Sequence, residues 1–301
     1  MKEETYHTPV LLHDSIDGLN INPDGVYVDA TFGGGGHSRE LLKRLDKGRL
    51  IAFDQDPDAQ RNTIDDPRFT LVAQNFRFMK NYLRFYGIKE VDGVLADLGV
   101  SSHQFDEGER GFSIRFDAPL DMRMSQNGDL SAKQVINNWE ESELTHMFKS
   151  YGELSNARKI SQLIVEARED EEITTTADLL KALTSVTPPI KQHKFQAQVF
   201  QAIRIAVNQE MEALEEMLEQ SIELLKPNGR LSVITYHSLE DRMVKYFMRS
   251  GNKKGEVEKD FFGNQLSPVK PLIKGSSPGA EETRKNPRAR SARLRVAVKV
   301  K

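Results

Sequence analysis

The chain of 301 residues contains no cysteine, and no apolar run in it approaches the length that crosses a bilayer. Without cysteine there can be no disulfide framework, no thiolate nucleophile and no zinc or iron–sulfur site held by cysteine. The N-terminus has acidic residues where a secretory signal needs net positive charge. We therefore expect a cytoplasmic protein without a membrane partner.

The chain also lacks a general excess of positive charge, since its formal net charge is -3. Phosphate binding depends on clustered Lys and Arg, so this charge argues against a protein that coats nucleic acid with its whole surface. One local basic segment follows the last acidic residue, Glu282, and consists of Arg284, Lys285, Arg288, Arg290, Arg293, Arg295, Lys299 and Lys301. Such a run is commonly a solvated tail, but the alternation of Leu294, Val296 and Val298 equally fits a terminal strand with its charges on one face.

Short apolar runs separated by helical spacing indicate an open α/β sheet built from βαβ units. The predicted parallel strands are residues 26–30, 50–53, 69–73 and 91–96, with a further strand at 230–235. Between residues 106 and 209 the pattern is helical, and the sheet pattern then returns. We therefore expect the first part of a sheet domain at 1–105, an inserted helical domain at 106–209 and the second part of the sheet domain at 210–301.

Three local patterns refine this outline. Ser131 with Gln134 predicts a capped helix start, and one long helix is expected across residues 207–225. Residues 251–286 are rich in Gly, Lys, Ser and Pro, so we expect a long surface connection with a strand near residues 269–273.

The strongest chemical signal is a run of four glycines in Asp29-Ala30-Thr31-Phe32-Gly33-Gly34-Gly35-Gly36-His37, which joins the first predicted strand to a helix. A turn without Cβ atoms lets backbone N–H groups approach a ligand at the carboxyl edge of the sheet, where open α/β folds bind small molecules. A dinucleotide fingerprint would need its third glycine where Ser38 or Arg39 stands. A P-loop would need glycine at Thr31 and lysine at His37. The loop therefore argues against both NAD and ATP.

Asp54 follows the second predicted strand, at the same edge of the sheet as the glycine loop. A carboxylate there suits a ribose diol, because a charged acceptor takes hydrogen bonds from both hydroxyls. The alternative is that the glycines form only a tight turn and that Asp54-Gln55-Asp56 only ends a strand. Two such features at successive strand ends of one sheet favour a cofactor site.

Along nearly its whole length the chain resembles the bacterial RsmH (MraW) family of small-subunit rRNA methyltransferases. The stretches that carry this resemblance are His7-Thr8-Pro9-Val10-Leu11-Leu12, the glycine loop from Asp29 to His37 with Ser38, Asp97-Leu98-Gly99-Val100-Ser101-Ser102, Arg110-Gly111-Phe112-Ser113, Pro119-Leu120-Asp121-Met122-Arg123-Met124, Phe200-Gln201-Ala202-Ile203-Arg204-Ile205, His237-Ser238-Leu239-Glu240-Asp241-Arg242 and Asn286-Pro287-Arg288-Ala289-Arg290-Ser291.

The resemblance implies an α/β fold, a Rossmann-like class I methyltransferase sheet with helices on both faces and an inserted all-helical domain for substrate recognition. It implies N4-methylation of a cytidine in the decoding region of small-subunit (16S) ribosomal RNA, with S-adenosyl-L-methionine as donor. The implied partner is this rRNA within an assembled or assembling 30S subunit, while the oligomeric state stays open, a homodimer included. The implied cofactor contacts are Gly35, Gly36, His37, Asp54, Phe76, Asp97 and Gln104.

Two stretches depart from the family pattern. His103 stands where the family commonly has proline after Ser-Ser. Before Phe200-Gln201-Ala202 the family commonly has a segment of the type His-Pro-x-Thr-Arg. This chain has His193-Lys194-Phe195-Gln196-Ala197-Gln198-Val199 there, so an rRNA contact by an arginine at that place loses its support.

The predicted reaction sets the search for catalytic residues. The N4 amine of cytosine is a poor nucleophile because its lone pair is delocalised into the ring, so an enzyme must position it in line with the methyl group. A carboxylate hydrogen-bonded to N4–H can also localise the lone pair. Asp97, which ends the fourth predicted strand, is a candidate for donor binding, which we favour, or for polarising N4. Tyr236 and His237 close the strand 230–235, where they either stack on an extruded base or form an ordinary turn.

Two further donor-site residues each have a plain structural alternative. His37 has no partner at metal-ligand spacing, so we expect it to contact the donor, and we predict no metal site. Phe76 follows the third predicted strand, where it either covers an adenine or belongs to the core.

Arginines are the candidates for RNA contact. In the basic segment the predicted RNA-binding residues are Arg288, Arg290 and Arg293. Elsewhere, isolated arginines can contact phosphate but more often form salt bridges, and this applies to Arg115, Arg123 and Arg204.

Other classes of function fit the sequence less well. A non-catalytic rRNA-binding assembly factor that retains a donor pocket would be expected to have lost a loop glycine or Asp54, and none is lost. A dinucleotide oxidoreductase is disfavoured by the failed fingerprint. DNA amino-methyltransferases commonly place an (Asp/Asn/Ser)-Pro-Pro-Tyr motif after the fourth strand, where this chain has Asp97-Leu98-Gly99-Val100.

Overall fold

The computed structural model of the protein describes residues 9–101, 104–105, 107–126, 128–263 and 265–300. The chain forms two compact units, a sheet unit composed of Met1–Gly99 and Met211–Lys301 and a helical unit composed of Val100–Glu210. The helical unit starts before residue 106 because Val100 and Phe105 pack against its hydrophobic core. Among the residues described, no helix has both the length and the apolar character needed to cross a membrane.

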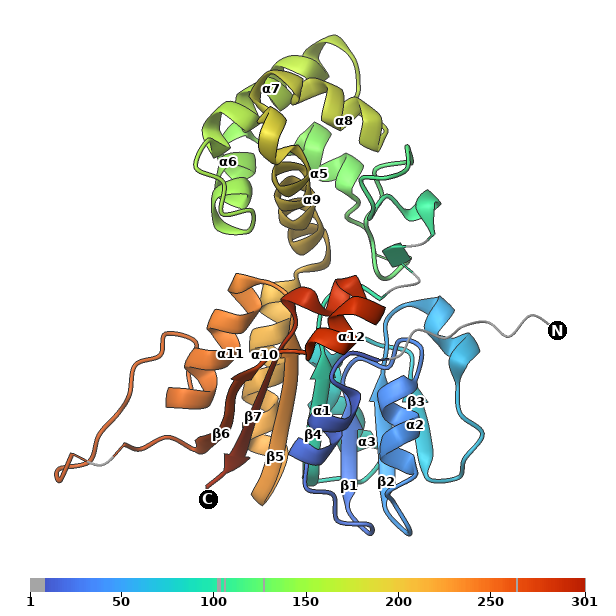
Figure 1. Ribbon diagram of the computed structural model, residues 1–301, viewed down its shortest axis with the longest axis vertical. Helices are drawn as coiled ribbons and strands as arrows, with labels where there is room; N and C mark the ends of the chain where they lie inside the picture. Colours follow the sequence, from blue (N-terminus) through green and yellow to red (C-terminus); the bar gives the residue numbers. More distant parts are fainter. Residues whose placement is uncertain (1–8, 102–103, 106, 127, 264, 301) are drawn as a thin grey trace. The chain divides into compact units, whose positions relative to one another are not determined.

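The sheet unit contains a seven-stranded sheet with the order β3-β2-β1-β4-β5-β7-β6 (Figure 1). The strands are β1 (Val26–Asp29), β2 (Arg49–Phe53), β3 (Phe69–Val72), β4 (Val91–Asp97), β5 (Leu225–Thr235), β6 (Val269–Ser276) and β7 (Arg293–Lys299). β1 to β5 pair in parallel, and β7 lies antiparallel between β5 and β6. The strand order reverses between β1 and β4, the kind of position at which open α/β sheets bind ligands. The expected α/β fold with a Rossmann-like sheet is thus confirmed.

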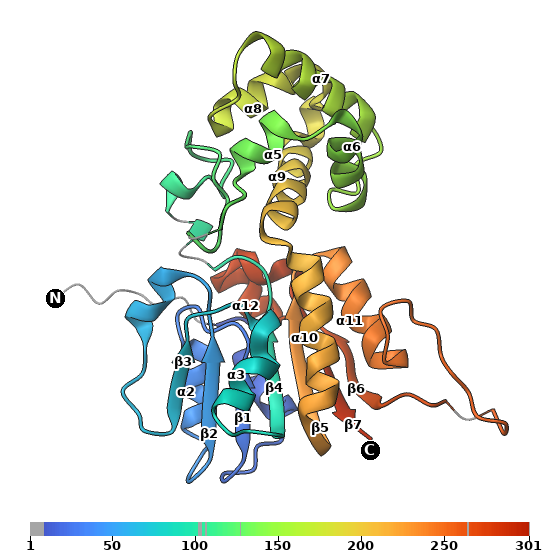
Figure 2. The same ribbon diagram turned by 180° about the vertical axis from the view of Figure 1, so that it is seen from behind.

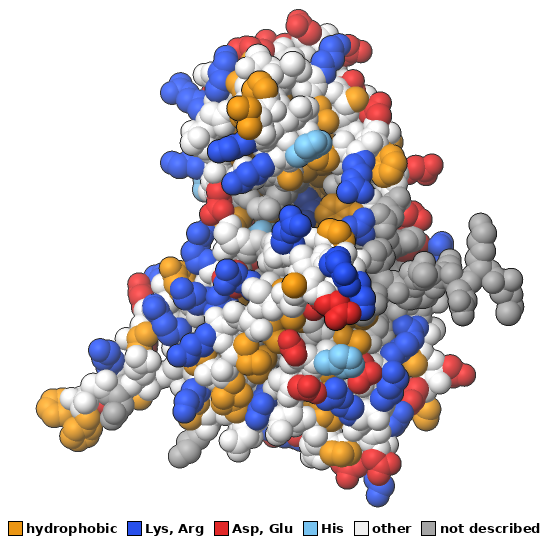
Figure 3. All heavy atoms as spheres, viewed as in Figure 1, with side chains coloured by type: hydrophobic (Ala, Val, Ile, Leu, Met, Phe, Trp, Pro, Cys, Tyr) orange, Lys and Arg blue, Asp and Glu red, His pale blue; other side chains and the backbone are white. Residues whose placement is uncertain are grey.

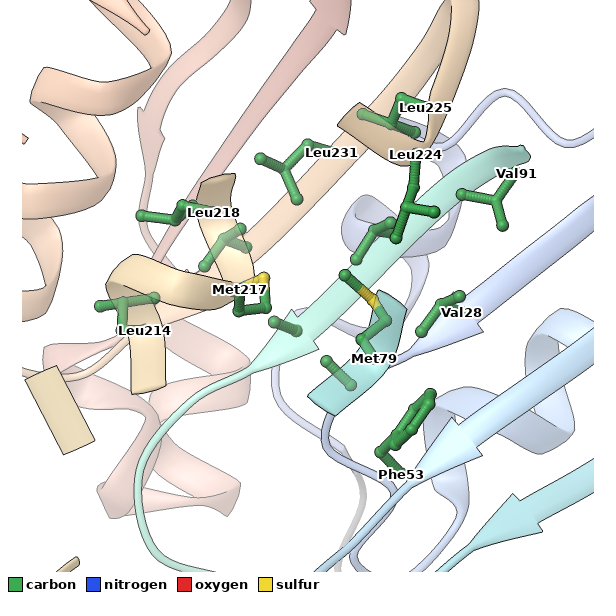
Figure 4. Packing of buried hydrophobic residues seen from close by; sticks show 14 of the residues in the cluster. Val28, Phe53, Met79, Val91, Leu214, Met217, Leu218, Leu224, Leu225 and Leu231 are labelled. Atoms are coloured by element: carbon green, nitrogen blue, oxygen red, sulfur yellow. The ribbon is translucent and has the colours of Figure 1, made fainter. Parts of the chain in front are cut away.

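Helices cover both faces of this sheet, as expected (Figures 1 and 2). Leu50 of β2 packs on one side with α1 and α2, whereas its neighbour Ile51 packs on the other side with α3, α10 and α11. Figure 4 shows the second face, on which Met79 of α3 lies beside Val28 and Phe53. This alternation is the two-residue period of a sheet that is buried on both sides. The helices are α1 (Leu12–Gly18), α2 (Gly36–Leu42), α3 (Met79–Phe85), α10 (Glu210–Leu224), α11 (Ser238–Ser250) and α12 (Ala280–Lys285).

Three details differ from the sequence expectations. β5 begins before residue 230, because Leu225 already pairs with Val91, and the register shifts before Gly93 pairs with Arg230. The helix expected across residues 207–225 is two helices, since Gln209 has a left-handed φ of 50° that ends α9 before α10 starts. The connection expected at 251–286 contains the short helix α12 in addition to β6.

The helical unit packs its helices around a core of its own. They are α5 (Ala132–Asn138), α6 (Glu141–Ser150), α7 (Ala157–Asp170), α8 (Thr176–Ala182) and α9 (Gln192–Asn208). The capping box predicted at Ser131 and Gln134 is present. The family-departing segment 193–199 lies in α9, where Phe195 and Val199 are buried in the core.

Short 3-10 helices complete the description of both units: η1 (Pro57–Asn62), η2 (Phe76–Phe78), η3 (Gly108–Arg110), η4 (Thr184–Val186), η5 (Pro189–Lys191) and η6 (Pro287–Ser291).

Candidate functional site

The carboxyl ends of β1, β2 and β4 meet at one edge of the sheet and are joined there by hydrogen bonds. The Gly33 N–H donates to Asp54 Oδ2 at 2.8 Å, which links the loop after β1 to the residue after β2. The Asp97 N–H donates to Thr31 Oγ1 at 2.6 Å, which links the same loop to the end of β4. The two predicted carboxylates therefore flank the glycine loop. The sequence pattern assigns no role to Thr31, because the N–H group from which it accepts belongs to Asp97, 66 positions away.

The glycines of the loop have different roles in the fold. Gly35 has a φ of 75°, and a Cβ on it would lie 2.7 Å from the Arg39 guanidinium and 2.8 Å from the Phe32 ring. A Cβ on Gly36 would lie 2.1 Å from the Pro9 ring. Gly33, with a φ of 51°, has open space where its Cβ would be. Gly35 and Gly36 are thus required for packing, and their contact with a donor stays a prediction, whereas Gly33 faces the open side of the loop.

Asp54 is half-buried beside this open side. Its Oδ2 accepts from Gly33, and its Oδ1 accepts from the Asp56 N–H at 2.8 Å. Burial raises the pKa of the Asp54 carboxyl to about 6, although these two hydrogen bonds oppose the shift. Because a carboxylate offers about four acceptor positions, two remain for a ligand's hydroxyl groups.

Asp97 is the carboxylate at the end of β4. Its Oδ1 accepts a hydrogen bond from the Tyr236 hydroxyl at 2.8 Å, and its Oδ2 lies 3.8 Å from His37 Nδ1. Burial raises the pKa of the Asp97 carboxyl to about 7, so both protonation states are populated near neutral pH. Burial and the nearby Asp97 charge raise the pKa of Tyr236, which keeps its hydroxyl protonated as the donor of this bond.

His37 is buried between the loop and the residues that precede α1. Its Nε2 lies 3.2 Å from the carbonyl oxygen of Val10. A carbonyl only accepts, so the Nε2 carries the hydrogen and the Nδ1 faces Asp97 with its lone pair. Burial lowers the pKa of His37, which favours this neutral form.

Asp29, which ends β1, stabilises the glycine loop by hydrogen bonds and is not available on the open side of the loop. It is 1% exposed and accepts from Ser38 Oγ at 2.6 Å and from the Thr31 N–H at 3.1 Å. These bonds tie the start of the loop to the first turn of α2. The carboxylates that remain for a ligand are therefore Asp54 and Asp97.

Tyr236 and His237 form the junction between β5 and α11. His237 is the N-cap of α11, and its Nδ1 accepts from the Glu240 N–H at 3.4 Å. Glu240, which is buried and which the sequence analysis missed, accepts from the Tyr236 N–H at 2.8 Å and from the His237 N–H at 3.2 Å. The His237 Nε2 lies 3.1 Å from Glu240 Oε1 without the geometry of a hydrogen bond. The cap orients Tyr236 toward Asp97, and base stacking by either ring stays a prediction.

The remaining predicted site residues are spread over both units. Phe76 begins η2 just after β3 and packs, half-buried, against the sheet core. Gln104 belongs to the helical unit, where its Oε1 accepts from the Ser101 N–H at 3.0 Å. The family-like residues His7, Thr8 and Ser102, and the departure at His103, lie outside the described residues.

The described part of the basic C-terminal segment is folded and is not a solvated tail: it comprises the end of α12, the short helix η6 and the strand β7. Within β7, Arg295 is 6% exposed and pairs with Asp241 of α11 through two hydrogen bonds of 2.8 and 2.9 Å. Arg293, Arg295 and Lys299 stand at alternating positions of β7 and therefore share one face of the strand, on which Arg295 is buried against α11. Arg290 and Arg293 are exposed and Arg288 is half-buried. Figure 3 shows basic and acidic side chains together over α12.

Two of the three isolated arginines of the helical unit, Arg123 and Arg204, form ion pairs with acidic side chains. The Nε and Nη2 of Arg123 donate to the two carboxylate oxygens of Asp121, each at 2.8 Å, and those of Arg204 donate in the same manner to Glu210 at 2.8 and 2.9 Å. The salt-bridge interpretation is confirmed for these two residues. Arg115 is exposed.

The residues at the sheet edge fit a cationic methyl donor chemically. S-adenosylmethionine carries a positive sulfonium and a ribose diol, and a cation stabilises the ionised form of a carboxylate. Burial raises the pKa of both Asp54 and Asp97, so a positive charge brought by a ligand would stabilise their ionised forms. The open space at Gly33 adjoins Asp54, whose Oδ2 accepts from the Gly33 N–H.

Comparison with known proteins shows to which family the chain is related. The family described as the MraW methylase family matches residues 4–300. A ribosomal RNA small subunit methyltransferase H of Flavobacterium johnsoniae is 58% identical over 296 residues, covering 98% of both chains. The protein of that name from Bacteroides fragilis is 55% identical over 304 residues, covering 99% of this chain and 100% of its own. With this match across its length and this site at the switch point of its sheet, the chain belongs to the MraW methylase family.

Proposed function

We propose that the protein transfers a methyl group from S-adenosylmethionine to N4 of a cytidine in the decoding region of small-subunit ribosomal RNA. The observation that carries the proposal is the pair of carboxylates, Asp54 and Asp97, that flanks the glycine loop. The names of the relatives support small-subunit rRNA as the substrate class. The choice of N4 and of the decoding region follows from the family motifs in the sequence.

The transfer needs the amine nitrogen, the methyl carbon and the sulfur in line. The N–C bond forms as the C–S bond breaks, and the nitrogen then loses a proton. S-adenosylmethionine supplies the methyl group, and the protein supplies position and charge. Asp54 offers its free lone pairs to the ribose hydroxyls. The Oδ1 of Asp97 is engaged by Tyr236, so the Oδ2 is the free acceptor, which we assign to donor binding.

The rest of the chain is proposed to hold the RNA. The helical unit would act as the substrate-recognition domain, and Arg288, Arg290 and Arg293 would bind phosphates. We place the reaction in the cytoplasm, on rRNA within an assembled or assembling 30S subunit.

The identity of the labelled nucleoside tests the proposal directly. Radiolabelled donor is incubated with the protein and with small subunits that lack the modification, and the rRNA is then digested to nucleosides. Label in N4-methylcytidine is the expected result, and label in any other nucleoside contradicts the cytidine assignment. A parallel reaction with protein-free rRNA decides between the assembled subunit and naked RNA. Donor binding without any transfer would instead favour a non-catalytic assembly factor.

A further inference from the structure

The residues that precede α1 join the glycine loop to the C-terminal part of the chain. Pro9 lies against Gly36, and the Val10 carbonyl accepts from His37. Val10 and Leu11 are buried in one hydrophobic cluster, whose other members come from the end of the chain or from β5: Ile234, Ala289, Ala292, Leu294 and Val296. Residues 9–11 therefore form a strap that touches the glycine loop on one side and the C-terminal segment on the other.

The strap contains an uncommon backbone conformation. Leu11 has φ 50° and ψ 35°, in the left-handed region, and it is the N-cap of α1 without a side-chain cap. For a residue with a Cβ this region is strained relative to the right-handed one. Such a conformation persists only where the surrounding structure holds it.

Glu282 supplies the polar contact that holds Leu11. Its Oε1 accepts from the Leu11 N–H at 2.7 Å, across 271 positions in the sequence. Glu282 lies in α12, which both views place at one end of the sheet (Figures 1 and 2), and it is half-buried. A hydrogen bond to a charged acceptor is about twice as strong as one between neutral groups. Its neighbour Glu281 is exposed and pairs with Lys285 of the same helix.

These contacts connect Glu282 to Asp97 through successive residues. Glu282 holds Leu11, the adjoining Val10 carbonyl holds the His37 imidazole, and His37 faces Asp97. The carboxylate of Glu282 also lies close enough to Tyr236 to contribute to its raised pKa. The negative charge of Glu282 therefore acts on Tyr236, one of the two neighbours of Asp97.

We propose that Glu282 is a positioning residue for the donor site, which fixes residues 9–11 so that the Val10 carbonyl holds His37 against Asp97. The identity of the donor rests on the proposed function. The contacts that make Glu282 a support do not depend on it.

The test compares three variants in the full-length protein. Glu282→Ala removes the acceptor, Glu282→Gln keeps an acceptor oxygen without the charge, and Glu281→Ala is the matched control on the same helix. S-adenosylmethionine binding is measured by calorimetry well below the thermal unfolding midpoint of each variant. We expect Glu282→Ala to weaken binding about tenfold, as the loss of one hydrogen bond to a charged group implies. We expect Glu282→Gln to recover most of the affinity and Glu281→Ala to bind as the unmodified protein does.

A second measurement separates positioning from general stability. The imidazole nitrogen resonances of His37 are followed in protein with isotope-labelled histidine, assigned with the His37→Asn variant. Glu282→Ala should shift these resonances in the absence of donor, and Glu281→Ala should not. Unchanged donor affinity and unchanged His37 resonances in folded Glu282→Ala would overturn the inference. If the unmodified protein does not bind S-adenosylmethionine at all, the proposed function fails, while the His37 resonances still decide on the role of Glu282.

Discussion

At the scale of single residues, Asp97 combines a functional position with an energetic cost. Its pKa of about 7 lies above the value of 3.8 of an unperturbed aspartate. As pH rises from about 4 to 7, the folded chain keeps the proton on Asp97 that the unfolded chain releases. The donor-free protein therefore loses stability over this range, by up to about 1.4 kcal/mol per pH unit for this group. A bound cation reverses the penalty, since it favours the ionised carboxylate.

The first prediction follows from this titration. S-adenosylmethionine affinity should rise with pH through about 7 and level off above it, because the ionised Asp97 is the better partner of a sulfonium. Calorimetry between pH 6 and 8 measures the effect, and buffers of different ionisation enthalpy report the proton released on binding. In Asp97→Asn the rise near pH 7 should be absent, leaving the change at lower pH that comes from Asp54. Affinity that is constant from pH 6 to 8 in the unmodified protein contradicts the assignment of Asp97 to the donor.

The second prediction separates two glycines of one loop. Gly35→Val should destabilise the fold, because the side chain meets Phe32 and Arg39 at a positive φ. Gly33→Ala should cost only about 1 kcal/mol of stability, since its Cβ enters open space, yet it should weaken donor binding beside Asp54. Thermal unfolding followed by circular dichroism and calorimetric titration measure the two effects. A stable Gly35→Val variant, or a Gly33→Ala variant with full donor affinity, would speak against this division.

At the scale of elements, the periodicity of apolar residues predicts the buried strands. It does not predict features that depend on a single backbone conformation or on a partner distant in sequence. The strands at residues 26–30, 50–53 and 91–96 were accessible from sequence because buried parallel strands read as apolar runs. The break between α9 and α10 was not, since it depends on one residue, Gln209, in an unusual backbone conformation. The burial of Arg295 was not accessible either, because its partner Asp241 is distant in sequence.

The same reasoning applies to the site. A glycine run and carboxylates after strands predict an edge site from sequence alone, because parallel strands end together. The acceptors Thr31, Glu240 and Glu282 act on backbone N–H groups, so their importance shows only once the fold brings those groups to them. Gln104 lies in the helical unit, and its donor contact stays a prediction.

The third prediction concerns the basic C-terminal segment. Replacing Arg288, Arg290 and Arg293 together with Gln should weaken rRNA binding and flatten its salt dependence, because each lost phosphate contact removes released counterions. Donor affinity should stay unchanged. Arg295→Gln is the contrasting variant, since it leaves Asp241 without its partner and should lower thermal stability. If the triple variant keeps the wild-type RNA affinity and salt dependence, the phosphate contacts must be made by other residues, and the helical unit is the next candidate.

At the scale of the whole molecule, the end of the chain lies inside the sheet. β7 pairs with β5 on one side and β6 on the other, and Leu294, Val296 and Ala297 are fully buried. The fourth prediction is that removal of residues 293–301 abolishes soluble expression, because β5 and β6 lose their shared partner and expose apolar edges. Removal of Lys301 alone is the control. A soluble, donor-binding truncated protein would show that the sheet tolerates the loss of an interior strand.

The bond between Leu11 and Glu282 sets an order of events during synthesis. A chain made from its N-terminus presents the glycine loop and the strap early, whereas the carboxylate that holds the strap is added 271 positions after Leu11. The contact spans nearly the whole sequence, so its formation carries the loop-closure cost of a very non-local pairing. A nascent chain that has not yet reached Glu282 therefore lacks the acceptor of the Leu11 N–H and leaves the strap unsupported.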